Sequence, residues 1–403
     1  MSCIEPYEFE VEGTADAIVI DGQLTNENTS HLIKLSNIPQ GDTSYFDPVQ
    51  GAEIKAVDSG GTEIIFQERE PGHYRTDTIQ GVIGEHYQLF IQLSDGTEIV
   101  SKQQEMLPIQ EVDSIYFKRV ANHLQDGVQK SGFEFYLDSY DHSNRSFSAR
   151  YEYVEDYEVA VPLPSNYEWS SDLGMPVPRE IAVDICYRSR LSDEFLIATT
   201  EGLSANAVEQ LPLSFVEENS TDLSGRYSVK VKQYVISAEL YQYYDALIKT
   251  SYTTGSFFEA QKGTVFGNLE VINNENLVIQ GVFEVSTVSE IVRLFDPLEL
   301  FGNSTLIPDG ISCKVNIETR MPEVFTVLVS DLPWILKHEY VLGVSFQGKD
   351  WRIVELIGDG VAPPGPNPFK IWEGGQGQLA TIAHRSCSEC TVHGNIQKPS
   401  YWD

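Results

Sequence analysis

Hydrophobic and polar residues alternate along most of this chain, and the alternation predicts a mainly β fold. The clearest case lies between residues 226 and 235, where Tyr227, Val229 and Val231 fall on one face and Lys232 falls on the other. A period of two places successive side chains on opposite faces of an extended chain. We therefore predict a strand with one buried face here.

The period changes directly after this strand. Ser237 is a suitable N-cap, Glu239 lies in the first turn, and Leu240 and Tyr244 fall on one helical face. The pattern predicts one prominent helix over about residues 237–251. In a β-rich chain, such a helix is expected to pack against a sheet.

The segment from residue 17 to residue 108 has short candidate strands separated by turn residues. The pairs Gly60-Gly61 and Asp95-Gly96 are strong hairpin signals. This pattern predicts an N-terminal β-sandwich of the immunoglobulin or transthyretin type. The candidate strands are Ala17–Leu24, His31–Leu35, Ala52–Asp58, Glu63–Gln67, Gly72–Thr76, His86–Leu93 and Glu98–Gln103.

The chain divides into three parts on composition. Residues 1–16 are acidic and are predicted to be a tether, residues 17–108 form the sandwich, and residues 112–403 form a larger β-rich domain. Two stretches rich in proline or glycine within the larger domain, residues 162–179 and 359–377, are predicted to be loops.

Charge excludes some partners. The chain has 60 acidic and 27 basic residues, so its net charge is -33. This balance argues against nucleic acid as a partner and against direct adhesion to anionic lipid surfaces, because both repel an acidic protein. No apolar run is long enough to predict a transmembrane helix.

Several sequence runs carry a resemblance to a known family. They are CYRSRLSDEFLIATTEGLS from Cys186, RYSVKVKQY, GNLEVINN and the ending CSECTVHGNIQKPSYWD. They resemble an uncharacterised family of Bacteroidota outer-membrane lipoproteins, described only as a domain of unknown function. Members are often encoded beside TonB-dependent transporters of the SusC type. The resemblance implies no catalytic residues and no cofactor.

Cys3 is the expected lipidation site. A small residue precedes it and an acidic run follows it, which resembles the mature start of a lipoprotein. The acidic run also resembles the signal that directs such lipoproteins to the cell surface. We therefore expect an outer-membrane location with a lipid anchor in the bilayer.

The remaining cysteines have alternative roles. Cys186, Cys313, Cys387 and Cys390 form an even set once Cys3 is lipidated, which favours disulfides outside the reducing cytosol. Four cysteines allow three pairings, and the residues do not choose among them. Free thiols are one alternative, and zinc is another, because the tail spaces its ligand types as His384, Cys387, Cys390 and His393.

Signatures of catalysis are absent from the sequence. It has no nucleophile elbow, zinc-protease helix or phosphate-binding loop. The run DSGG from Asp58 imitates the surroundings of a protease serine, but a hairpin turn between two strands explains it. A loop with Asp138, Asp141 and Asn144 is a candidate for calcium, although it lacks the EF-hand pattern.

The leading functional hypothesis is a non-enzymatic accessory protein, a lid, scaffold or capture protein of a SusC-like barrel. The alternatives are a stand-alone glycan- or protein-binding module at the cell surface and an enzyme with an unrecognised site. Aromatic residues outside any clear core period are the candidate contacts with a partner, because Tyr and Trp are enriched at interfaces. These residues are Tyr167, Trp169, Phe369 and Trp372.

Overall fold

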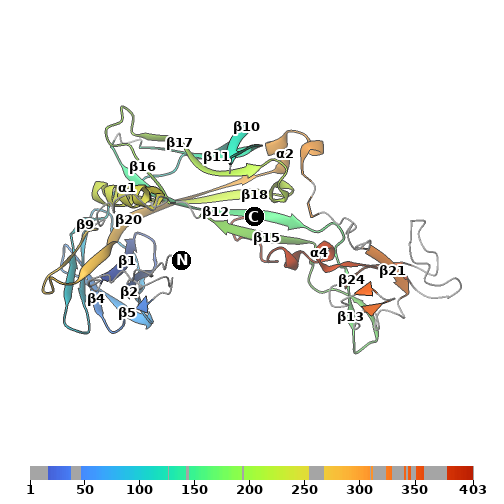
Figure 1. Cartoon of the computed structure of the whole chain (residues 1–403), viewed down its shortest axis with the longest axis horizontal. Coiled ribbons are helices and arrows are strands. Elements are labelled where there is room, and N and C mark those ends of the chain that lie inside the picture. The colour runs from blue at the N-terminus through green and yellow to red at the C-terminus, as the bar shows by residue number, and fades with distance from the viewer. Residues whose placement is uncertain are drawn as a thin grey trace, which may run out of the picture.

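The protein is elongated and mainly β (Figure 1). The computed structural model describes residues 17–37, 47–125, 127–141, 145–192, 195–253, 267–308, 310–311, 324–328, 340–341, 344–345, 351–357 and 379–402. An N-terminal module lies at one end of a long central sheet, and a smaller sheet lies at the other end. A three-stranded sheet lies above the central sheet.

The N-terminal module is a sandwich around one apolar core. All seven predicted strands are confirmed, and their buried residues alternate as expected, as in the pattern of Ile18, Ile20 and Leu24. The core joins Leu35 and Leu89 from opposite layers. The strands are β1 (Ala17–Thr25), β2 (Thr29–Asn37), β3 (Asp47–Pro48), β4 (Glu53–Asp58), β5 (Glu63–Glu70), β6 (His73–Ile79), β7 (His86–Gln92), β8 (Glu98–Ser101), β9 (Gln104–Glu105) and β19 (Leu269–Val271).

One strand belongs to both large modules. The first half of β20 (Val278–Phe295) pairs in parallel with β1, from Val278 to Ser286. Its second half pairs antiparallel with β18 (Tyr227–Ile236), from Thr287 to Phe295. We expected the first module to be complete before residue 108, whereas the structure adds β19 and half of β20 to it.

The central module is also a sandwich. Its lower layer is the sheet β15-β12-β18-β20, and its upper layer is the sheet β10-β11-β17. Aromatic rings fill the space between the two layers. The centre of the Phe135 ring lies 5.1 Å from that of Phe295 and 4.8 Å from that of Tyr227. The further strands are β10 (Ser114–Gln125), β11 (Val128–Tyr140), β12 (Ser148–Ala160), β15 (Ile185–Leu191), β16 (Leu196–Thr199) and β17 (Ala207–Glu217).

The predicted helix is confirmed as α1 (Ala238–Thr253). The Ser237 hydroxyl accepts the Leu240 backbone N–H at 3.3 Å, as an N-cap does. Leu240 and Tyr244 are buried against Tyr234, Val282 and other apolar residues of the central sheet. The smaller helical elements are α2 (Pro297–Phe301), α4 (Arg385–Ser388), η1 (Thr221–Leu223), η2 (Ser304–Leu306) and η5 (Cys390–Val392).

The prediction of a long loop over residues 162–179 is wrong. This stretch forms a hairpin of two strands that joins a five-stranded sheet. Two of its four prolines, Pro176 and Pro178, lie in the short edge strand β14, where a missing N–H interrupts no ladder. The strands are β13 (Tyr167–Ser170), β14 (Met175–Pro178), β21 (Val324–Leu328), β24 (Trp351–Ile357) and β25 (Leu379–His384), and β22 (Tyr340–Val341) pairs separately with β23 (Val344–Ser345). The predicted loop over residues 359–377 lies outside the described residues.

Glycine is required where β20 meets β1. Gly281 has a φ of +109°, and a Cβ there would lie 1.9 Å from the carbonyl oxygen of Ile20. Gly96 also has a positive φ, +87°, but a Cβ there would have nothing within 4 Å. Both glycines therefore have a backbone conformation that other residues rarely adopt, but only Gly281 also lacks space for a side chain.

We predict that Gly281→Ala lowers the free energy of unfolding by about 3 kcal/mol or more, because backbone must move to admit the methyl group. The matched variant Gly96→Ala is expected to cost only about 1–2 kcal/mol, from its backbone conformation alone. Urea unfolding of both variants measures the difference. Equal losses would contradict the close approach of β20 to β1.

Candidate functional site

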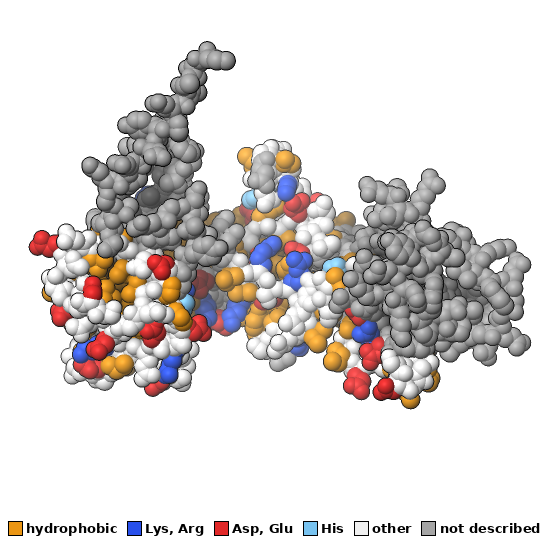
Figure 2. Space-filling view, turned by 60° about the horizontal axis from the view of Figure 1, so that its bottom comes forward, with side chains coloured by type: hydrophobic (Ala, Val, Ile, Leu, Met, Phe, Trp, Pro, Cys, Tyr) orange, Lys and Arg blue, Asp and Glu red, His pale blue; other side chains and the backbone are white. Residues whose placement is uncertain are grey.

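The lower face of the central sheet, opposite the three-stranded sheet, has an open stretch that we call the underside. The residues of the underside lie together, because the strand register places residues of β12 opposite residues of β18, and residues of β18 opposite residues of β20. Figure 2 turns the bottom of the molecule forward and shows Lys and Arg beside hydrophobic side chains in its middle part. The underside consists of Glu152, Val154, Lys230, Lys232, Glu290 and Val292.

The charges of the underside are paired within the protein. Lys230 Nζ lies 2.9 Å from Glu290, and Lys232 Nζ lies 2.7 Å from Glu27 of the N-terminal module. Val154 and Val292, which lie on either side of Lys230, are half-buried. The underside therefore presents apolar and charge-compensated groups, which suits binding to a surface better than acid–base chemistry.

A buried ion pair closes the underside at the α1 end. Arg150 donates to both carboxylate oxygens of Glu284, at 3.2 and 3.1 Å, and both residues are almost fully buried. The Tyr244 hydroxyl from α1 donates to the same carboxylate at 2.6 Å, and the Gln23 amide donates at 2.8 Å. Arg150 also lies 4.1 Å from the centre of the Tyr234 ring.

This arrangement keeps both partners charged. Burial alone would raise the pKa of Glu284, but the charge and hydrogen bonds of Arg150, with those of Tyr244 and Gln23, outweigh it and lower the pKa. Burial alone would lower the pKa of Arg150, and the Glu284 carboxylate more than reverses that shift. A carboxylate satisfied in this way is a structural anchor and not a poised acid or base.

The C-terminal tail closes the underside at its other end. Trp402 is almost fully buried, and its indole N–H donates to the Ser228 hydroxyl at 2.8 Å. Tyr187 packs edge-on against this indole at 5.3 Å, and the Arg226 guanidinium lies 5.1 Å from it. Next to it, the Tyr401 hydroxyl donates to the carboxylate of Asp156.

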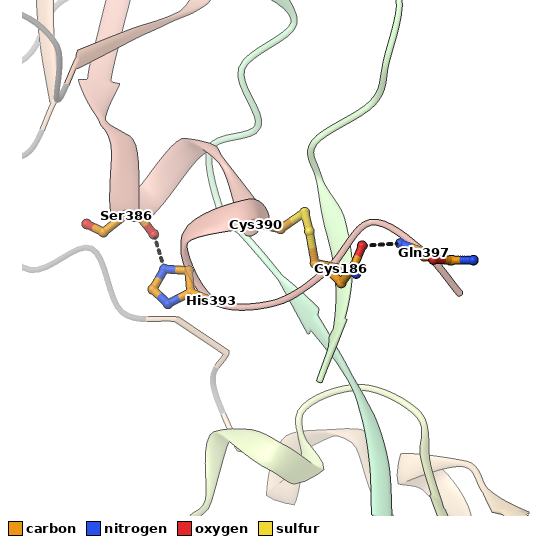
Figure 3. Close-up of a disulfide and its surroundings, with 6 residues drawn as sticks. Cys186, Ser386, Cys390, His393 and Gln397 are labelled. Carbon is orange, nitrogen blue, oxygen red and sulfur yellow. Dashed lines mark hydrogen bonds between the residues drawn. A yellow bond between two sulfur atoms is a disulfide. The ribbon is translucent and has the colours of Figure 1, made fainter. Parts of the chain in front are cut away.

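A disulfide fixes the same tail to the sheet. Cys390 is bonded to Cys186 of β15, which lies 204 residues earlier in the sequence (Figure 3). The expectation of disulfide bonding is therefore confirmed for this pair. Cys387 is also disulfide-bonded, and both Cys3 and Cys313 lie outside the described residues.

The disulfide removes the thiolate on which the zinc alternative depended. His393 is also occupied, because its Nε2–H donates to the Ser386 carbonyl at 2.7 Å (Figure 3). His384 is the last residue of β25. Within the described residues, no group of three or more His, Cys, Asp or Glu side chains is arranged to hold a metal ion.

Two carboxyl groups with raised pKa values bear on the enzyme alternative. Burial raises the pKa of Asp156, and burial also raises that of Asp222. Asp156 accepts hydrogen bonds from Ser189 and Tyr401, and Asp222 lies 3.9 Å from Arg190. Ser189 lowers the pKa of Asp156 and Arg190 lowers that of Asp222, so the raised pKa values come from burial within the fold.

The predicted contact residues fall in different places. Tyr167 lies in β13 and is half-buried, and Trp169 lies in the same strand, two residues further on. Phe369 and Trp372 lie outside the described residues. At the calcium candidate, Asp138 accepts from Tyr116 and from the Gln210 backbone, Asp141 pairs with Arg145, and Asn144 lies outside the described residues.

Sequence reasoning did not single out Arg150 or Glu284, and it noted the two tail aromatics only as part of the ending that carries the family resemblance. The sequence contained a signal for Arg150 and Glu284, because each of these charged residues has a hydrophobic residue on either side within a predicted strand. The run PSYWD gave no indication of its target, because Ser228 and Asp156 lie far away in the sequence.

Comparison with known proteins supplies a family. The model of the family described as "Domain of unknown function (DUF4249)" matches residues 4–291. The chain belongs to the DUF4249 family. No curated protein matches the chain. Within the part of this DUF4249 chain that the structure describes, no helix has the length and apolar character of a membrane span.

One solved structure is a distant match to this chain. A crystal structure of a DUF4785 family protein from Legionella pneumophila shares 11% identity with this DUF4249 chain, at a TM-score of 0.17. The match covers 54% of this chain, which spans about half (51%) of that protein. A likeness at this TM-score says nothing of fold or function.

We predict that Arg150→Met lowers the free energy of unfolding by about 3–5 kcal/mol, because it leaves the Glu284 carboxylate buried without its cation. The double variant Arg150→Met/Glu284→Leu should recover most of that loss, because it buries no charge. Urea unfolding at neutral pH measures both. A double variant no more stable than the single one would contradict this account of the pair.

The same pair predicts a pH dependence. The folded-state pKa of Glu284 lies below its ordinary value of 4.5, so its contribution is complete above that value and is lost as the pH falls through the lowered folded pKa. When the pH falls below 4.5, the free energy of unfolding should therefore decrease more for the wild type than for Glu284→Gln.

We predict that Cys186→Ala/Cys390→Ala lowers the free energy of unfolding by about 2–4 kcal/mol, because the bond closes a long loop. Peptide mapping of the wild type without reductant should first identify the linkage of Cys186 to Cys390. A map that joins Cys390 to another cysteine would show that the tail is attached elsewhere.

Proposed function

We propose that this protein is a non-enzymatic, lipid-anchored accessory protein at the surface of the outer membrane of a Bacteroidota cell. It acts as a lid, scaffold or capture protein of a SusC-type TonB-dependent transporter. Its partners are the transporter barrel and, through lipidated Cys3, the bilayer.

The observation that carries the proposal is the architecture of the central sheet. One continuous sheet holds the N-terminal module and the C-terminal sheet at opposite ends, and the underside stays open between the two closures described above. Buried charges are held in internal pairs at Arg150–Glu284 and Arg179–Glu389. This arrangement suits a protein that presents surfaces to a partner.

Sequence features support the location. The DUF4249 match begins at residue 4, directly after Cys3, and the acidic residues that follow resemble a surface-export signal. A disulfide between Cys186 and Cys390 suits a compartment outside the reducing cytosol. The net charge of -33 suits exposure to water.

We assign the transporter contact to the underside and to the neighbouring β13–β14 hairpin. The underside offers apolar side chains among compensated charges, and the hairpin carries Tyr167 and the exposed tip residues Leu173 and Met175. A partner with a near-neutral apolar surface fits this combination.

We predict that tagged protein from its native cell carries acyl chains on Cys3 and retains a TonB-dependent barrel when purified from detergent-solubilised outer membranes. Tyr167→Ala/Trp169→Ala, or Val154→Glu/Val292→Glu, should reduce the recovered barrel while the thermal unfolding temperature changes little. The same test applies to Phe369→Ala/Trp372→Ala.

The control is Ile65→Glu, which places a charge on an exposed apolar residue of the N-terminal module. It should leave barrel recovery unchanged. An unmodified Met1 terminus in native-cell protein would refute the anchor. Failure of the wild type to retain any barrel would refute the partnership and favour a stand-alone module.

A further inference from the structure

The outer face of the three-stranded sheet carries an unusual set of side chains for a surface turned away from the core. The inner face of β11 supplies the fully buried Phe133, Phe135 and Leu137. The alternate residues point outward and are half-buried or exposed, together with their neighbours on β10 and β17. We call these residues the aromatic face: Tyr116, Lys118, His123, Glu134, Tyr136, Asp138, Gln210 and Phe215.

Two pairs of rings stack on one another on this face. Tyr116 and Tyr136 are nearly parallel, with ring centres 5.8 Å apart, and the imidazole of His123 stacks on Phe215 at 3.9 Å. Phe215 lies over Gly132, where a Cβ would come within 2.7 Å of its ring. The missing side chain therefore lets this ring lie against the backbone.

Polar groups between the rings are held in place. The Glu134 carboxylate accepts from the Tyr136 hydroxyl and, at 2.6 Å, from Nδ1 of His123. Lys118 Nζ lies 4.8 Å from the centre of the Tyr136 ring and donates to the Gln210 side chain at 2.5 Å. These hydrogen bonds order long side chains before any ligand arrives, which lowers the entropic cost of binding.

The hydrogen bond between Tyr136 and Glu134 also shifts the pKa values of both residues. Donation by Tyr136 is the main cause of the lowered pKa of Glu134, and the same bond raises the pKa of Tyr136 to about 12. Glu134 and Lys118 lie opposite each other across the strands, so this part of the face carries compensating charges.

Backbone strain is concentrated at the same place. Gln210 has a φ of +54°, the one positive value at a residue other than glycine in the described part of the chain. It lies at a register shift between β11 and β17, and its N–H donates to Asp138 at 2.7 Å. Strain of this kind persists where surrounding contacts enforce it, and it is common at ligand sites.

We propose that the aromatic face binds a neutral oligosaccharide. Sugar rings combine apolar C–H faces with rims of hydroxyl groups, which match flat aromatic rings and fixed carboxylate, amide and amine groups. This ligand goes beyond the proposed transporter partnership and does not depend on it.

The net charge of the chain argues against one rival occupant of the aromatic face. Nucleic acid, which also stacks on aromatic rings, is disfavoured by the net charge of -33. A hydroxyl-rich neutral ligand uses both the rings and the polar groups.

The test is isothermal titration calorimetry of the purified chain alone with soluble neutral oligosaccharides derived from starch, cellulose, xylan and mannan. At least one should bind, and Tyr116→Ala and Lys118→Met should each weaken that binding roughly tenfold or more. The control is Phe90→Ala, which removes an exposed aromatic ring from the N-terminal module and should leave affinity unchanged.

Gln210→Gly separates binding from folding. Glycine accepts a positive φ, so the urea midpoint should stay unchanged or rise, whereas oligosaccharide affinity should fall because the amide is lost. A lowered midpoint with unchanged affinity would assign Gln210 a structural role and overturn the proposal. Absence of binding to every probe, or binding that these variants leave unaltered, would also overturn it.

Discussion

The division of β20 between two partners is the constraint on which the rest of the structure depends. Residues 278–286 complete the N-terminal module beside β1, and residues 287–295 complete the central module beside β18. Parallel strands need a crossover connection, and here the crossover contains most of the central module. The two modules therefore share a backbone element.

This connection also shapes how the chain can fold. β1 meets its parallel partner only after more than half of the chain has been made, so the N-terminal core is finished by a distant segment. Such non-local pairing is slow to form because loop closure comes before the stabilising contacts. Gly281 makes this pairing possible, because the absence of a side chain lets the backbones of β20 and β1 approach each other closely.

Two arginines of this acidic chain pair with buried carboxylates. Arg150 lies against Glu284 at the α1 end, and Arg190 donates to Glu155 at 2.7 Å near the tail end. Each carboxylate also accepts a tyrosine hydroxyl, from Tyr244 and Tyr227 respectively. In a sheet that connects two modules, these pairs favour a single register, because any slip would leave a charge buried without its partner.

Sequence alone determined the class of fold and most of its strands. The alternation at Tyr227, Val229 and Val231 and the change of period at Ser237 are local signals, because burial of one face repeats every two residues in a strand and about every 3.6 in a helix. The same pattern failed between residues 162 and 179, where prolines suggested a loop. Tertiary structure decided that outcome, because pairing with β24 and β14 supplies the contacts that make this short stretch a strand.

The candidate sites depended still more on tertiary structure. Sequence could name Cys186 and Cys390 as an expected part of a disulfide set, but four cysteines allow several pairings and only their positions in space select one. The period of two in β11 shows that Glu134, Tyr136 and Asp138 share a face, but not that His123 and Phe215 stack beside them. Those contacts arise between strands, from register and bulges, and local periodicity contains no information about which strand lies next to which.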